Sequence, residues 1–241
     1  MLDWKVYTVS AALLIAALLI TYLFCFAPEG GEVDTEGGEG VVDLPSPETA
    51  GGMSVKKAIA RRRSMRSYSE ESLTLEQVSQ LLWSAQGVTG SGGEKRAAPS
   101  AGMTYPLELY LVVGSEGVNR LDNGLYHYVP EGHELEKVLT GDLHQELADA
   151  ALDQEWVEKA PIDIVVTAVY SRTTSRYGER GRRYVHMEAG HVGQNLYLQS
   201  ESLGLGMVVV GAFDDGRVQE VLDLPKKRKP LYIIPIGHLL E

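Results

Sequence analysis

The sequence predicts an α+β domain that follows one membrane-spanning helix. Three observations support this prediction: an uncharged apolar run near the amino terminus, an acidic segment rich in glycine and proline after it, and a remainder in which strand and helix patterns alternate only partly. The chain has 241 residues, of which 44% are hydrophobic, so it can bury the core of one domain. Its single cysteine, Cys25, excludes a disulfide framework and any multi-cysteine metal site.

Residues 1–27 are predicted to form a transmembrane anchor. No charged side chain occurs in Val6–Ala27, and a helix of this length spans about 33 Å, enough for a hydrocarbon layer of about 30 Å. Cleavage as a signal peptide is one alternative, but such peptides have shorter apolar regions that end in small residues. Lipidation at Cys25 is another, but Cys25 lacks the small-residue context of a lipoprotein cleavage site. Lys5 before the run and acids after it favour a single-pass protein with a cytoplasmic amino terminus.

Residues 28–52 are predicted to form an acidic linker rich in glycine and proline. Residues 27–52 hold seven acids and no lysine or arginine, so this stretch carries −7 of the formal net charge of −11. The first 26 residues are neutral, which leaves −4 for residues 53–241. Such a segment cannot bury enough apolar surface to offset its ordering entropy, so we expect a self-repelling tether.

Residues 53–241 are predicted to form the globular domain. Thr74 and Gln77 match a capping box and Gly87 a stop signal, which predicts a helix over Leu75–Gln86. A short helical run is expected from Ser54, and another helix over Asp142–Ala151. Runs rich in apolar and β-branched residues predict strands at Pro106–Val113, Leu125–Val129, Ile162–Tyr170, Met207–Val210 and Leu231–Ile236.

The longest predicted helix covers Arg182–Leu203 and has two faces that can pack. One row is apolar and consists of Val185, Ala189, Val192, Leu196 and Leu203. A second row contains two glycines, which would let another backbone approach, and consists of His186, Gly190, Gly193 and Tyr197. The helix is therefore either the central core helix of a monomer or part of a subunit interface.

Three short segments are candidates for binding a cofactor. The densest basic cluster offers guanidinium and hydroxyl groups that suit a phosphate monoester, although a solvated basic turn is the alternative; it contains Arg62, Arg63, Ser64 and Arg66. A turn before a strand could present its backbone to a flat ligand, or be an ordinary loop, and consists of Pro99, Ser100, Ala101 and Gly102. An apolar strand bordered by glycines could lie against an aromatic ring system or belong to the core, and ends with Val209, Val210 and Gly211.

No metal site is predicted. His186 and His191 lie five residues apart, which turns a helix by about 500° and directs the two imidazoles about 140° apart. Nucleic-acid binding is not predicted either, because the arginine run alone would support it.

Five motifs, taken in order, resemble the nitroreductase superfamily and in particular its SagB-type dehydrogenase branch. They are RRRSMRSY, APSAGMTYPLELYLV, SRYGERGRRYVHMEAGHVGQNLYLQSESLGLG, VVVGAFDD and LYIIPIG. The resemblance covers about Ser54–Gly237 and implies an FMN-binding α+β sandwich with a central mixed sheet, which dimerises through long helices. It implies that Arg62, Arg63, Ser64 and Arg66 hold the phosphate and ribityl chain of FMN.

The same resemblance implies roles for the other two segments. Pro99, Ser100, Ala101 and Gly102 would approach the flavin from the other subunit, and Val209, Val210 and Gly211 would lie along its isoalloxazine ring. The implied activity is two-electron transfer between FMN and a small organic substrate, with NAD(P)H or a membrane quinol as donor.

The candidate catalytic pair departs from the family pattern. Peptide-oxidising relatives carry a Lys-Tyr pair where this chain has Arg176 and Tyr177. Arginine stays protonated and cannot act as a general base, whereas Tyr177 could still donate a proton or a hydrogen bond. Two alternatives to a nitroreductase-type enzyme therefore stay open: an oxidase of peptide heterocycles, and an inactive flavin-fold binding module.

Overall fold

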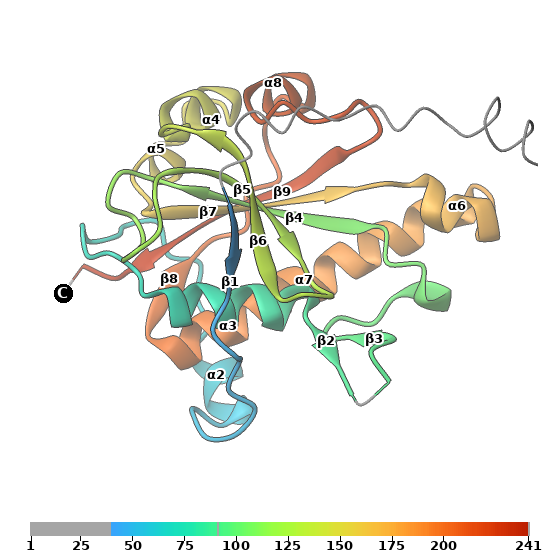
Figure 1. Ribbon diagram of the computed structural model, residues 1–241, viewed down its shortest axis with the longest axis horizontal. Coiled ribbons are helices and arrows are strands. Elements are labelled where there is room, and N and C mark those ends of the chain that lie inside the picture. Colours follow the sequence, from blue (N-terminus) through green and yellow to red (C-terminus); the bar gives the residue numbers. More distant parts are fainter. Residues whose placement is uncertain (1–39, 91, 241) are drawn as a thin grey trace, which may run out of the picture. The chain divides into compact units, whose positions relative to one another are not determined.

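The computed structural model describes residues 40–90 and 92–240, which fold around a seven-stranded sheet with helices on both faces (Figure 1). The strand order is β1-β6-β5-β4-β7-β9-β8. The strands are β1 Val41–Asp43, β4 Leu107–Val113, β5 Gly124–Val129, β6 Glu134–Thr140, β7 Ile162–Ala168, β8 Leu205–Met207 and β9 Lys229–His238. Each neighbouring pair is antiparallel. The α+β prediction is confirmed, but the predicted mixed sheet is wrong, because no neighbouring pair of these strands is parallel.

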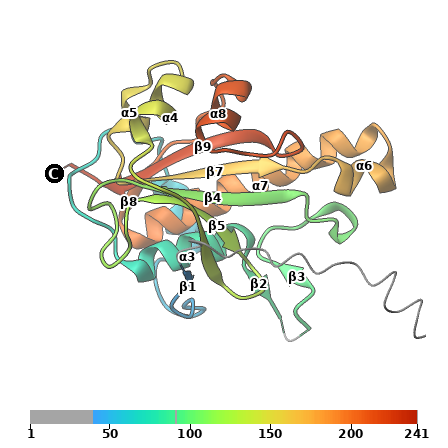
Figure 2. The same ribbon diagram turned by 45° about the horizontal axis from the view of Figure 1, so that its top comes forward.

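Helices form a layer on each side of the sheet (Figure 2). Helices α3 and α7 cover one face, α4, α5 and α8 cover the other, and α6 lies beyond the ends of β4 and β7. The helices are α2 Val55–Arg61, α3 Leu75–Gln86, α4 His144–Ala150, α5 Glu155–Glu158, α6 Ser171–Tyr177, α7 Arg180–Leu203 and α8 Asp215–Val221. A small hairpin, β2 Val88–Thr89 and β3 Lys95–Arg96, precedes the short 3₁₀ turn η1 at Ala101–Met103.

The alternation of side chains along the central strands explains the two layers. On β7, Ile162, Ile164 and Val166 join the hydrophobic cluster under α3 and α7, whereas Val165 joins the cluster under α4 and α8. Every residue of β7 is buried, as the nearly continuous apolar run predicts for a strand covered on both faces.

The two longest predicted helices are confirmed. Thr74 caps α3 through the expected capping box with Gln77. Gly87 is the residue at which this helix stops, as predicted, and a side chain would not fit there, since an added Cβ would lie 2.2 Å from Trp83 Cδ1. Helix α7 begins at Arg180, two residues earlier than predicted, and ends at Leu203 as predicted; its cap residue is Gly204, whose φ of 75° suits glycine. Its apolar row is buried at Val185, Ala189, Val192 and Leu196.

The domain begins earlier than the predicted boundary at residue 53. Val41–Asp43 pairs with β6 and Leu44 is buried in the core, although both belong to the predicted linker 28–52. The three-residue strand is hidden in the sequence because the segment around it is acidic and rich in glycine. Strand β6 is also absent from the sequence predictions, because charges interrupt its apolar pattern.

The predicted strand Met207–Val210 is displaced in the structure. Strand β8 ends at Met207, and the chain then continues beside β9 with paired hydrogen bonds between Val210 and Ile233. The predicted transmembrane anchor, 1–27, lies outside the described residues, as does the first part of the predicted linker. In 40–90 and 92–240, no helix has the length and apolarity that crossing a membrane requires.

A buried histidine between two carboxylates ties α4 to the central strand. His144 Nδ1 lies 2.8 Å from Asp142 Oδ1, and its Nε2 lies 3.2 Å from Asp163 Oδ2 on β7. Asp163 is fully buried, and burial raises its pKa to about 6. Burial opposes the charge on His144, but the hydrogen bonds and charges of both aspartates outweigh it and raise the pKa of His144 to about 9.

This arrangement predicts a loss of stability at alkaline pH. Because the pKa of His144 is raised on folding, its stabilising contribution is complete below about pH 6.5 and is lost as the pH rises through about 9. We expect the free energy of unfolding in urea to fall by on the order of 2–3 kcal/mol between these limits. The uncharged double variant His144→Gln/Asp163→Asn serves as control and should lack this dependence. An equal fall in that control would assign the effect to other groups.

Candidate functional site

The segment after α2 meets the last turns of α7 at Tyr197. The Ser64 Oγ and the Tyr197 hydroxyl are hydrogen-bonded at 2.9 Å, and the Tyr197 hydroxyl accepts a bond from the Val209 N–H at 3.2 Å. The Arg62 guanidinium lies over the Tyr197 ring, 4.9 Å from its centroid. We call Arg62, Ser64, Tyr197 and Val209 the Tyr197 cluster. It joins residues from two of the three predicted cofactor segments.

Open glycine positions adjoin the Tyr197 cluster. A Cβ built on Gly190 of α7 or on Gly211 would meet no atom within 4 Å, so both positions face open space. Gly193, also on α7, lies against the cluster, since a Cβ there would be 3.5 Å from Val209 Cγ2. The site therefore combines a guanidinium and hydroxyl groups with a surface that lacks side chains, which suits a flat ligand carrying a phosphate.

Two of the predicted phosphate ligands point elsewhere. Arg63 Nη1 donates to the carbonyls of Ala60, Arg61 and Arg62, at 3.2, 3.4 and 2.8 Å, and so caps the carboxyl end of α2. Arg66 lies over the Trp156 ring, 5.3 Å from its centroid, in a cavity of about 680 Å³. Of the four predicted basic-cluster residues, the structure thus brings Arg62 and Ser64 together.

The predicted turn and the predicted catalytic pair lie together at the other end of α7. Arg176 Nη1 donates to the Gly102 carbonyl at 3.0 Å. A Cβ added to Gly102, whose φ is 60°, would lie 2.5 Å from the Tyr177 hydroxyl. The Tyr177 ring packs edge-on against Tyr184, with centroids 5.2 Å apart. Pro99 and Gly102 are exposed, and Ser100 and Ala101 are half-buried.

The two halves of the predicted site lie on opposite sides of α7. Ser100 hydrogen-bonds to Glu188 on this helix, and Tyr197 follows nine residues later. Nine residues correspond to about 900° of rotation and about 14 Å of rise, which places Glu188 and Tyr197 about 180° apart. Within one chain, the turn and the Tyr197 cluster therefore face different sides of α7.

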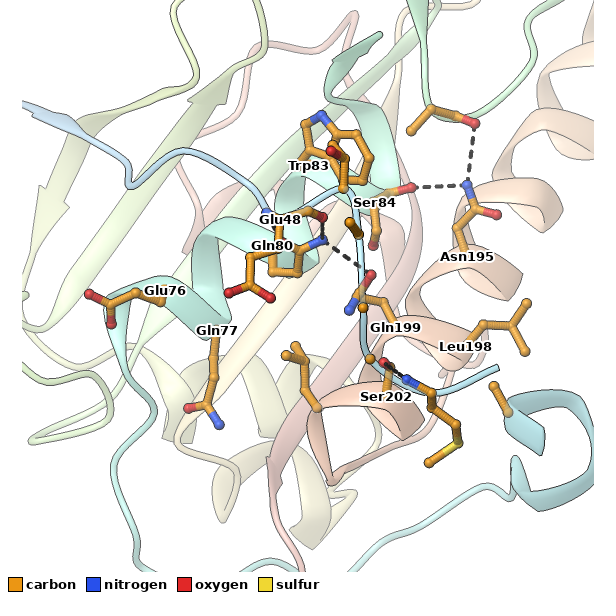
Figure 3. Close-up of a pocket in the computed structure, with 18 of the residues that line it drawn as sticks. Glu48, Glu76, Gln77, Gln80, Trp83, Ser84, Asn195, Leu198, Gln199 and Ser202 are labelled. Atoms are coloured by element: carbon orange, nitrogen blue, oxygen red, sulfur yellow. Dashed lines mark hydrogen bonds between the residues drawn. The ribbon is translucent and has the colours of Figure 1, made fainter. Parts of the chain in front are cut away.

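A separate cavity of about 560 Å³ lies between residues 46–53, α3 and α7 (Figure 3). Its polar side chains are hydrogen-bonded within the chain: Gln80 Nε2 donates to Gln199 Oε1 at 3.4 Å, and the Asn195 side-chain amide donates to the backbone carbonyl of Ser84 at 2.9 Å. None of the predicted cofactor or catalytic residues lines this cavity. Its volume is therefore not evidence for the chemistry of the predicted site.

The sequence does not identify Tyr197 as the residue that joins the cluster, and it does not identify Trp156 as the neighbour of Arg66. The only sequence signal for Tyr197 is its position on the row of α7 that contains two glycines. Its hydroxyl contacts involve two segments that lie far away in the sequence. Trp156 carries no local motif, and its Nε1 is buried without a hydrogen-bond partner among the described residues.

Comparisons with known proteins show what this chain is similar to. Residues 59–238 match the nitroreductase family. The chain is 44% identical over 200 residues to a Methanocaldococcus jannaschii protein named as a nitroreductase, a match that covers 83% of this chain and 97% of that protein. It is 29% identical over 160 residues to the microcin B17-processing protein of Escherichia coli, covering 64% of this chain and 58% of that protein. A crystal structure from Ralstonia eutropha, also named as a nitroreductase, matches with a TM-score of 0.73 at 30% identity, covering 85% of this chain and 91% of the other.

The contacts of Tyr197 predict a measurable contribution to stability. Tyr197→Phe removes the hydroxyl that joins Ser64 to Val209, so we expect the free energy of unfolding to fall by about 1 kcal/mol. Tyr184→Phe is the matched control, because the structure shows a ring contact for Tyr184 and no hydrogen bond of its hydroxyl to the described residues. Urea unfolding of both variants provides the measurement. Equal stabilities of the two variants would contradict the joining role of Tyr197.

Proposed function

The chain belongs to the nitroreductase family, and from this premise we propose that it is an FMN-dependent oxidoreductase that works as a homodimer. The observation that carries the proposal is the Tyr197 cluster beside the open positions of Gly190 and Gly211. The first feature suits the phosphate and ribityl chain, and the second suits the rings. When bound, FMN would supply two-electron transfer to or from a small organic substrate.

Residues of this chain would hold the cofactor by charge and by hydrogen bonding. Arg62 is half-buried beside the Ser64 hydroxyl, and a guanidinium can bind a phosphate through two parallel hydrogen bonds. Val209 and Gly211 would follow the rings. Val210 is 3% exposed and exchanges backbone hydrogen bonds with Ile233, so it fixes this segment to β9. Arg66 is exposed at Trp156 and could reach the cofactor after a rotamer change.

The opposite placement of the two half-sites on α7 supports the homodimer. The turn Pro99–Gly102 and the Tyr197 cluster could meet one cofactor only if two chains each contribute one of them. The exposed face of α7, which includes His186 and Gly190, is available for a contact between two copies. The long-helix interface implied by the sequence is consistent with this arrangement.

Arg176 and Tyr177 are the proposed catalytic residues. The Arg176 guanidinium holds the Gly102 carbonyl and keeps the turn against α6. Since arginine stays protonated, it could orient an anionic or carbonyl group of a substrate but could not remove a proton. The Tyr177 hydroxyl lies beside Gly102 and could donate a proton or a hydrogen bond to a substrate.

A second candidate is oxidation of heterocycles in a peptide. Similarity to the microcin B17-processing protein favours it, and arginine at position 176 argues against the base-assisted route of the relatives. Oxidation of an azoline-containing peptide by the FMN-loaded chain would favour this candidate, and NAD(P)H-dependent reduction of a nitroaromatic or a quinone would favour the first. A chain that binds FMN but does neither would be the inactive flavin-fold module.

We also propose that residues 1–27 tether the domain to a membrane with a cytoplasmic amino terminus. The support is the uncharged run Val6–Ala27. In that setting a membrane quinol is an alternative to NAD(P)H as electron donor.

The cofactor assignment predicts that Arg62 governs FMN affinity. The full chain, purified in detergent, should be yellow, and Arg62→Ala should weaken FMN binding at least about tenfold because a phosphate loses a charge-assisted hydrogen bond. Arg62→Ala/Arg66→Ala should weaken it further if Arg66 also reaches the phosphate. The control is Arg120→Ala, since the Arg120 side chain is 75% exposed and pairs with Glu76 on the surface. Fluorescence titration with FMN measures the affinities.

Two results would contradict the cofactor assignment. One is equal FMN affinity of the Arg62→Ala and Arg120→Ala variants. The other is a monomeric mass by light scattering under conditions in which the chain retains FMN.

The proposed role of Tyr177 predicts a loss of turnover with intact cofactor binding. Tyr177→Phe should lower kcat by about 10²-fold or more if the hydroxyl transfers a proton, whereas FMN affinity should stay unchanged. Stopped-flow mixing with NADH, NADPH or a quinol identifies the donor, and turnover is then measured with a nitroaromatic or a quinone. Tyr184→Phe changes the neighbouring ring and should retain full turnover. Wild-type turnover of Tyr177→Phe would remove this hydroxyl from the mechanism.

A further inference from the structure

The turn after Pro99 has a strained backbone. Gly102, Met103 and Tyr105 have φ values of 60°, 53° and 40°, and the last two are not glycines. A left-handed conformation costs a residue with a side chain on the order of 1 kcal/mol or more, and it persists when surrounding contacts hold it. The contacts of this turn therefore decide its shape.

Helix α6 holds the outer side of the turn. Arg172 Nη1 donates to the Tyr105 carbonyl at 2.9 Å, and the hydroxyls of Thr104 and Thr173 are hydrogen-bonded at 2.8 Å. Within the turn, the Tyr105 N–H donates to Ser100 Oγ at 3.0 Å. Because Ser100 Oγ accepts this bond, its own O–H is free to donate elsewhere.

A hydrogen bond from the Ser100 hydroxyl lowers the pKa of a buried carboxylate on α7, that of Glu188. Glu188 is 2% exposed, and it also accepts a hydrogen bond from Gln86 Nε2 at 3.5 Å. Gln86 in turn accepts from Arg96 Nη1 at 3.4 Å. Arg96 is the charged group that faces Glu188 from the neighbouring elements, and its own ion pair is with Glu131 at 2.7 Å. The carboxylate of Glu188 thus has two donors, one on the turn and one at the end of α3.

We propose that Glu188 is a positioning residue that fixes the turn Pro99–Gly102 through Ser100, in the shape in which the turn meets the cofactor of a second copy. The contact of the turn with the cofactor of a second copy rests on the proposed function. The link between Glu188 and the shape of the turn is independent of it. Glu188 touches neither the Tyr197 cluster nor the Tyr177 side of the turn in the described contacts, so it acts through Ser100.

A carboxylate suits this position because it offers two acceptor oxygens to two donors. An amide at position 188 would accept through one oxygen and present N–H groups to the other donor, so one of Ser100 and Gln86 would lose its partner. Burial raises the pKa of Glu188, and the hydrogen bonds of Ser100 and Gln86 and the charge of Arg96 offset part of this rise. The resulting pKa is about 7. The ionised, two-acceptor form therefore predominates above about pH 7, and the turn should be held more firmly there than at pH 6.

Hydrogen exchange tests this inference on the full chain without added cofactor. In Glu188→Gln, the amides of residues 100–105 should exchange at least about tenfold faster at pH 8. This factor corresponds to the free energy lost with one hydrogen bond to a charged group. The difference from wild type should be smaller at pH 6, after correction for the intrinsic exchange rate. Glu201→Gln is the matched control: it lies 13 residues further along the same helix, pairs with Arg61, and should leave these amides unchanged.

A second variant covers the case in which Glu188→Gln folds poorly. Ser100→Ala removes the same hydrogen bond together with the bond that Ser100 Oγ accepts from the Tyr105 N–H, so it should also speed exchange over residues 100–105. If Glu188 acts through Ser100, adding Glu188→Gln to Ser100→Ala should cause no further acceleration over these residues. Additive effects of the two substitutions, or equal exchange in Glu188→Gln and Glu201→Gln, would overturn the proposal.

FMN titration separates failure of this inference from failure of the proposed function. If wild type binds FMN, Glu188→Gln should weaken its retention in the dimer several-fold, and Glu201→Gln should not. If wild type fails to bind FMN, the cofactor assignment fails, and the exchange results still decide whether Glu188 fixes the turn.

Discussion

Helix α7 is the element on which the remaining structure depends. Its buried row, Val185 to Leu196, packs under the sheet, and packing of this kind fixes the rotation of a helix about its axis. Once that rotation is fixed, Tyr197 faces the segment after α2, and Glu188 faces the turn before β4. The hydrophobic contacts on one side of α7 therefore set the positions of polar groups on two other sides. Packing in the core therefore determines the geometry of the candidate site.

The sequence was sufficient where the local pattern and the tertiary environment agree. The capping box at Thr74 and the apolar row of α7 predicted helices that the structure confirms, because capping and burial favour the same boundaries. Strand β7 was predicted for the same reason. Strands β1 and β6 were not: β1 is three residues long and pairs with a strand far away in the sequence, and charged residues interrupt the apolar pattern of β6.

The sequence also predicts the candidate site only in part. Motif order identified Arg62, Ser64 and Val209 as neighbours of one cofactor, and the structure brings these three together around Tyr197. Motif order could not show that Arg63 caps α2 or that Arg66 lies on Trp156, because the rotamer of a long cationic side chain depends on which acceptors and rings are nearby. Residue type thus predicts the membership of a site better than the direction of each side chain.

The segment between β1 and α2 also depends on packing against α7, and on packing against α3. Leu44 is buried, Glu48 exchanges two hydrogen bonds with Gln80 on α3, and the Met53 N–H donates to Ser202 Oγ on α7. The residues that lead into α2, and therefore to Arg62, are held by the same two helices that flank the cavity of Figure 3. A domain cut at the sequence boundary of residue 53 would lose β1 and these anchors. It would expose the edge of β6 and leave the amide of Gln80 without its backbone partner, although every motif of the predicted site would still be present.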